Sequence, residues 1–239
     1  MDLSTLLGGI GARIAPDDAP TPGWWVATAL VAALVVIAVP PLWRLTRPAV
    51  TIVHELGHAV IGMAFGRRFA GFVVSADMSG HALTVGPRRG IGRIASTWAG
   101  YPAPALIGAV LVQVSLLGWA RTALCIALVV LVLSLVFTRS LHTVAAVLAT
   151  AAAVGALWWW GSPALIALLT LAAGAFLLLG AWRHLGAVIR TGGRGDDPAQ
   201  LGQLTALPAG VWTLSFALVI ALCSWWAGSP LVEAVGGLR

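Results

Sequence analysis

The sequence has few charged residues and lacks two polar residue types. Only 9% of its 239 residues are charged, and asparagine and lysine do not occur. Hydrophobic residues make up 59% of the chain, and the mean hydropathy is +0.95. Soluble domains carry far more polar residues than this. We therefore expect an integral membrane protein, with too few residues left outside its apolar segments for a separate soluble domain.

Cysteine content and charge distribution argue against two further classes of protein. The two cysteines, Cys125 and Cys223, lie far apart within apolar segments, so neither a disulfide framework nor a cysteine metal site is indicated. All 14 basic residues are arginines scattered between apolar segments. That pattern is typical of membrane topology rather than of nucleic-acid binding.

Apolar runs predict an all-α polytopic membrane protein of about seven transmembrane helices. Residues 1–23 contain no continuous apolar core, so we expect a retained cytoplasmic N-terminal segment rather than a signal peptide. Residues 24–239 then form one membrane-embedded domain, and Pro40 to Pro48 mark the break between its first two spans. The expected spans are 24–42, 49–66, 94–118, 121–138, 141–160, 163–187 and 205–227.

The arginines favour one orientation of these spans. Seven crossings would gather ten of the 14 arginines on the side of residues 1–23 and leave four on the other side. Cytoplasmic loops carry the excess of arginine, which predicts a cytoplasmic N-terminus and an external C-terminus. Between the second and third spans, alternating apolar residues flank a Met78-Ser79-Gly80 turn and predict a β-hairpin at about residues 69–86.

One motif within the second span suggests chemistry. In a helix, His54 and His58 lie on one face, where two imidazoles can bind one zinc ion and Glu55 can act as a base. From composition alone such a motif would arise about once in a thousand chains of this kind. Polar residues within a membrane span usually mark function. Mutual hydrogen bonding of the three groups, or a structural metal without turnover, stays open as an alternative.

The sequence Thr51-Ile-Val-His-Glu-Leu-Gly-His-Ala59 resembles the zinc-binding helix of the site-2 protease family of intramembrane metallopeptidases. The hairpin and the Ala99-Gly-Tyr-Pro-Ala-Pro104 entry to the third span are similar to the small bacterial, peptidase-like branch, which has no PDZ insertion. The resemblance covers roughly residues 49–110 and 195–212. It implies Zn²⁺ as cofactor, a membrane-protein substrate, and a multi-pass position in a bacterial plasma membrane.

The third metal ligand is less clearly indicated. Well-known members of the family take it from an Asn-Pro and Asp-Gly motif, which this chain lacks. The soluble-protease continuation also fails, because Ile61 and Ala64 replace the required glycine and histidine. By resemblance to the small branch, Asp197 is the first choice and Asp196 the alternative. Asp197 before Pro198 is also an ordinary helix-capping pattern that needs no metal.

The other polar residues receive simpler interpretations. We expect His142 and His184 at membrane interfaces, His81 in solvent beside the turn, and Gln113 in a hydrogen bond between helices.

Three functions remain in competition: a zinc-dependent endopeptidase cleaving membrane proteins, a non-proteolytic zinc-binding relative, and an ion- or proton-coupled transporter. No internal repeat supports the transporter, and nothing in the sequence indicates the oligomeric state.

Overall fold

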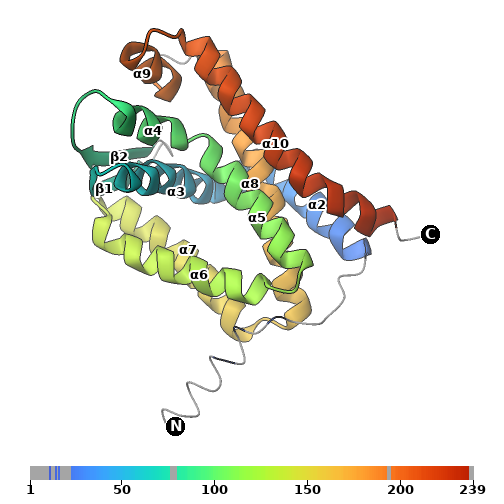
Figure 1. The fold of residues 1–239 in the computed structure, drawn as a ribbon. Coiled ribbons are helices and arrows are strands. Elements are labelled where there is room, and N and C mark those ends of the chain that lie inside the picture. The colour runs from blue at the N-terminus through green and yellow to red at the C-terminus, as the bar shows by residue number, and fades with distance from the viewer. Residues whose placement is uncertain are drawn as a thin grey trace.

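The computed structural model describes residues 23–75, 80–192 and 195–236, together with residues 11, 14 and 16. Most of the predicted N-terminal segment and the Met78-Ser79 turn lie outside these residues. The described chain is a helical bundle with a single hairpin (Figure 1). Its elements are α2 (Gly23–Ala38), α3 (Pro40–Ala64), β1 (Arg68–Val74), β2 (Gly80–Val85), α4 (Ile91–Ala99), α5 (Pro102–Leu116), α6 (Ala120–Ser134), the 3-10 helix η1 (Leu135–Phe137), α7 (Leu141–Trp160), α8 (Pro163–Thr191), α9 (Asp197–Leu204) and α10 (Ala209–Gly236).

The all-α membrane architecture with its hairpin is confirmed, but the count of seven spans is not. Four stretches, namely α6 with η1, α7, α8 and α10, are long and apolar enough to cross a bilayer. The pairs α2–α3 and α4–α5 also qualify if each is counted as one bent span, which gives at most six among the described residues. An even count would place both ends of the membrane domain on one side, so the predicted orientation stays a prediction.

The break between the first two predicted spans is shorter than expected. Only Val39 separates α2 from α3, and the two helices meet at 102°. Pro40 and Pro41 occupy the first turn of α3, where the missing N–H groups would have no helical partner. The helix then continues through Pro48, so the prediction of a break over Pro40 to Pro48 is wrong. The third predicted span is likewise bent, by 56° between α4 and α5.

Helices α5 and α8 pack together at the centre of the bundle, with α10 and α2 beside them (Figure 1). Their crossing depends on two glycines. A Cβ added to Gly108 would lie 2.6 Å from the Gly174 carbonyl oxygen, and one added to Gly174 would lie 2.7 Å from that of Gly108. Small residues allow such close helix contact in membranes. Gln113 donates to the Trp226 carbonyl at 2.8 Å, which confirms its predicted interhelical hydrogen bond.

The hairpin forms as predicted and packs against α3 and α7. Phe72 and Val74 of β1 are fully buried. The outer edge of β1 is already occupied, because the Arg139 amide and side chain donate to the carbonyls of Phe72 and Ala70. Thr143 at the start of α7 accepts from the Val74 amide at 2.8 Å. These contacts hold the hairpin against the α6–α7 pair.

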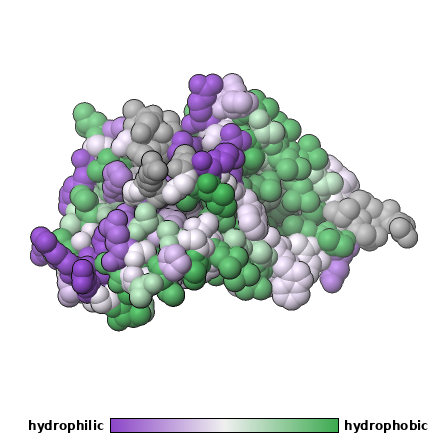
Figure 2. Space-filling view, turned by 90° about the horizontal axis from the view of Figure 1, so that it is seen from above, coloured by the Kyte–Doolittle hydropathy of each residue, from purple (hydrophilic) through white to green (hydrophobic). Residues whose placement is uncertain are grey.

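Apolar side chains remain on much of the outer surface. In Figure 2 they dominate the right-hand half, the side on which Figure 1 shows α2 and α10. Hydrophilic side chains gather toward the left and centre, where Figure 1 shows the hairpin, α4 and α9. Exposed leucine, valine and tryptophan on a bundle of this kind indicate contact with lipid.

Candidate metal centre

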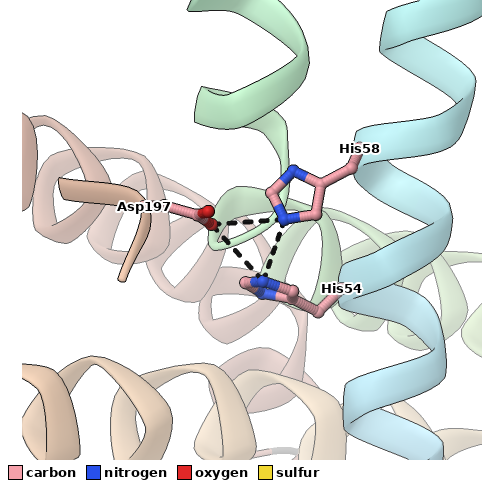
Figure 3. A group of neighbouring side chains, drawn as sticks. All are labelled: His54, His58 and Asp197. Carbon is pink, nitrogen blue, oxygen red and sulfur yellow. Dashed lines mark hydrogen bonds and ion pairs between the residues drawn. The ribbon is translucent and has the colours of Figure 1, made fainter. Parts of the chain in front are cut away.

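Helix α3 supplies two histidines to one point. His54 and His58 are one turn apart, so their side chains project from the same face. Their Nε2 atoms lie 3.1 Å from each other, and the two rings meet edge to face. Both imidazoles are therefore turned toward a common point beside α3 (Figure 3).

Helix α4 fixes the orientation of one imidazole. The Nδ1 atom of His58 lies 2.7 Å from the Ser96 carbonyl oxygen, which can only accept a hydrogen bond. Nδ1 thus carries the proton, and Nε2 keeps its lone pair for a metal. The Ser96 hydroxyl donates in turn to the His58 carbonyl at 2.8 Å. This reciprocal pair joins α3 and α4 beside the histidines.

Asp197 reaches the same point from the first turn of α9. Its Oδ2 atom lies 3.4 Å from His54 Nε2 and 3.2 Å from His58 Nε2 (Figure 3). The three side chains can offer ligand atoms that all lie within 4.8 Å of one another. Burial alone would raise the pKa of the Asp197 carboxyl. When the rings of His58 and His54 also carry a proton on Nε2, their attraction and hydrogen bonding outweigh burial and hold this pKa below its ordinary value.

The two aspartates have different positions. Asp196 is the residue before α9, makes no side-chain capping bond, and does not belong to the three-residue group. Burial and the neighbouring Asp197 charge raise the pKa of its carboxyl. The capping interpretation of Asp197 is wrong, because Asp197 lies inside the first turn and its carboxylate points at the imidazoles.

Glu55 lies between α3 and the hairpin. The residue is 2% exposed, and its Oε2 atom has no hydrogen-bond partner among the described residues. A Cβ added to Gly80 of β2 would overlap Glu55 Oε1 and would lie 2.8 Å from the Glu55 carboxyl carbon. Glycine at the start of β2 therefore lets the strand approach the carboxylate closely.

A second glycine allows the α4–α5 junction to approach the histidines. A Cβ added to Gly100 would overlap the His58 ring and would lie 2.8 Å from His54 Cε1. The next residue, Tyr101, is buried, with its ring edge to face with His54 at 4.9 Å and stacked on Phe216 at 5.0 Å. The bend between α4 and α5 thus forms one wall of the site.

These groups open onto a cavity of about 220 Å³. Glu55, the two histidines and Asp197 line it, together with residues of β2, α4 and α9. The other described histidines and carboxylates that follow His58 in the sequence lie elsewhere or at the edge of this cavity. His142 is exposed at the start of α7, Glu233 is exposed in α10, and His184 packs on Trp43 with its Nε2 atom unpaired among the described residues. Asp77 is outside the described residues.

His81 was expected in solvent beside the turn, and it is an exposed residue of β2 that also lines the cavity. The sequence alone did not indicate the roles of Ser96 and Gly80 around the site. Gly100 belongs to the Ala99–Pro104 segment, which the resemblance had already placed at the entry to the third span. No periodicity or spacing marks the other two, because each acts through a contact between elements distant in sequence.

The donor set fits a zinc ion. Tetrahedral ligands at ~2.0–2.1 Å from zinc lie ~3.3 Å from one another, which matches the 3.1, 3.4 and 3.2 Å separations of the three ligand atoms. Two imidazoles and a carboxylate leave a fourth position open, as in catalytic rather than structural zinc sites. Asp197 Oδ2 has no hydrogen-bond donor other than the imidazoles, so no other group competes for it within the described chain.

Comparison with known proteins places the chain in a family. No curated protein and no solved structure matches it. The model of a family described as "Peptidase M50B-like" matches residues 27–228, which include α3, the hairpin and α9. The chain therefore belongs to the Peptidase M50B-like family, part of the site-2 protease family of intramembrane metallopeptidases.

Proposed function

We propose that this protein is a zinc-dependent intramembrane endopeptidase that hydrolyses a peptide bond in a membrane-protein substrate. His54, His58 and Asp197 bind the zinc ion, and Glu55 is the catalytic base. The observation that carries the proposal is the approach of Asp197 to within 3.4 Å of both imidazoles from a helix far along the chain. Membership of a metallopeptidase family supports it independently.

Each side chain has a distinct task in this reaction. His54 and His58 offer neutral nitrogen ligands, and the Ser96 carbonyl holds His58 in the required tautomer. Bound zinc supplies Lewis acidity, which polarises the scissile carbonyl and lowers the pKa of water toward ~7. Glu55 accepts the proton of the attacking water and returns it to the leaving nitrogen. The free Oε2 atom of Glu55 suits both transfers.

The hairpin offers a place for the substrate. A transmembrane helix hides its peptide bonds in internal hydrogen bonds, so it must unwind before cleavage. An unwound segment can recover hydrogen bonds by adding to the edge of a strand. The outer edge of β1 is occupied by Arg139 and Thr143, whereas Gly80, His81 and Ala82 of β2 line the cavity beside Glu55. We therefore assign substrate addition to β2.

The cellular setting follows from the same proposal. The lipid bilayer surrounds the apolar faces of the bundle, and the substrate is another membrane protein. We place the protein in a bacterial plasma membrane with its N-terminus in the cytoplasm, as the arginine distribution predicts.

The test compares wild-type protein with Glu55→Gln in cells. New protein termini would be mapped across the membrane proteome, since this readout works even when the substrate has not been identified. Termini that fall within transmembrane segments should depend on Glu55, because loss of a general base lowers rate by ~10²–10⁴-fold. Purified Glu55→Gln should keep its zinc, whereas His54→Ala should lose it.

Glu233→Gln is the matched control, since Glu233 is the other glutamate and lies exposed in α10. It should give the wild-type set of termini. Identical termini from the wild type and Glu55→Gln would contradict proteolysis and favour a non-proteolytic zinc protein. Absence of zinc from the purified wild type would contradict the metal centre itself.

A further inference from the structure

Helix α9 carries Asp197, yet little in its own sequence holds it in place. The helix has eight residues, and isolated helices shorter than ~12–15 residues are marginal in water. Its position must therefore come from contacts with the rest of the bundle, chiefly with α4 and α10. Any contact that orients α9 also orients the third ligand of the proposed zinc site.

One such contact crosses the cavity from α4. Arg93 Nη2 donates to Gln200 Oε1 at 3.1 Å, and both side chains are partly buried at the cavity wall. Gln200 follows Asp197 by three residues, so the two lie on the same face of α9. That face thus presents the carboxylate to the imidazoles and the amide to the guanidinium. Leu201, fully buried beside them, packs in the main core.

Arg93 and Gln200 each lie on a helix that also carries a residue of the metal centre. Arg93 lies on the same short helix as Ser96, whose carbonyl accepts from His58 and whose hydroxyl donates to the His58 carbonyl. Helix α4 is therefore tied to α3 by Ser96 and to α9 by Arg93. This bridge through α4 therefore helps to set the distance between Asp197 and the histidines, together with the packing of α9 on α10.

We infer that Arg93 and Gln200 form a clasp that positions Asp197 for zinc binding, a role that rests on the proposed zinc site. Arg93 is a positioning residue: it acts through Gln200 and α9 rather than as a ligand. Guanidinium suits this task, because a charged donor strengthens a hydrogen bond in a partly buried cavity. Residues that orient metal ligands typically change metal affinity by ~10–100-fold when they are removed.

The experiment measures zinc affinity of the full-length protein in detergent by competition with a chelator. Arg93→Ala and Gln200→Ala should each weaken zinc binding by ~10–100-fold. The double variant should be no weaker than either single variant, because one contact is lost in all three. Arg93→Lys keeps a charged donor and should recover part of the affinity. The visible spectrum of the cobalt-substituted protein should change in Arg93→Ala, since it reports ligand geometry.

Ser215→Ala supplies the matched control. Ser215 accepts from Trp98 of α4 at 2.9 Å, so this variant removes a bond between α4 and α10 without touching α9. It should bind zinc as the wild type does. Wild-type affinity in folded Arg93→Ala, or an equal loss in Ser215→Ala, would overturn the clasp while leaving the zinc site intact. Failure of the wild type to bind zinc would instead overturn the proposed function.

Discussion

Gly100→Ala tests whether the α4–α5 junction shapes the metal centre. Gly100 has φ −59° and ψ −56°, a helical conformation that alanine adopts readily, so the substitution adds no backbone strain. Its only direct effect is the new methyl group. That group would overlap the His58 ring and lie 2.8 Å from His54 Cε1, whereas carbon atoms pack at ~3.5–4.0 Å.

The required shift is therefore ~0.7–1.2 Å at His54 and more at His58. The junction cannot easily retreat, because α5 is packed against α8 through the Gly108–Gly174 contact. We expect the imidazoles to move instead. Zinc sites tolerate only ~0.2 Å of distance error, and overpacking costs ~1–3 kcal/mol. At 1.4 kcal/mol for each factor of ten, zinc affinity should fall by ~5–150-fold.

The assay is chelator competition on the purified protein, with melting of the metal-free protein as a check on folding. Gly155→Ala in α7 is the matched control, since its methyl group would meet only Leu128 methyls at 3.7 Å. It should keep wild-type affinity. Folded Gly100→Ala with wild-type zinc affinity would refute the steric reasoning, as would an equal loss in Gly155→Ala.

Two further predictions concern residues around the same centre. Asp197→Ala should bind zinc at least about tenfold more weakly, whereas Asp196→Ala should retain it, because of these two aspartates only Asp197 lies within reach of both imidazoles. Metal analysis of both purified variants measures the difference, and an unchanged zinc content in Asp197→Ala would contradict the assignment. Gly80→Ala should retain zinc but lower cleavage by about tenfold or more, because its methyl group displaces Glu55 and a misplaced base slows the reaction steeply. The yields of Glu55-dependent termini measure this loss. Wild-type yields would argue against close packing of β2 on the base.

Much of this site could be predicted from the sequence because its central signal is local. The His54-Glu55-x-x-His58 spacing needs only a helix to place two imidazoles on one face, and α3 provides it. The hairpin could be predicted equally well, because alternating apolar residues over a few positions predict strands. Asp197 was harder, because its carboxylate and an ordinary helix start share the same sequence pattern.

Other features depend on packing that no local pattern encodes. The 102° turn falls at Val39, directly before Pro40 and Pro41, whereas α3 passes through Pro48, where a proline removes one helical hydrogen bond. Composition predicted seven spans because it treats each apolar run as a crossing. Gly80 and Gly100 matter only because other elements lie against them, and the Arg93–Gln200 contact joins residues 107 positions apart.

The most direct test of the proposed zinc centre is a crystal structure of the purified, zinc-loaded protein with anomalous data collected at the zinc edge. We expect one peak in the cavity, with His54 Nε2, His58 Nε2 and an oxygen of Asp197 each at ~2.0–2.2 Å from the zinc ion. Absence of the peak, or a peak whose carboxylate ligand is Asp196 or Glu55 in place of Asp197, would contradict it.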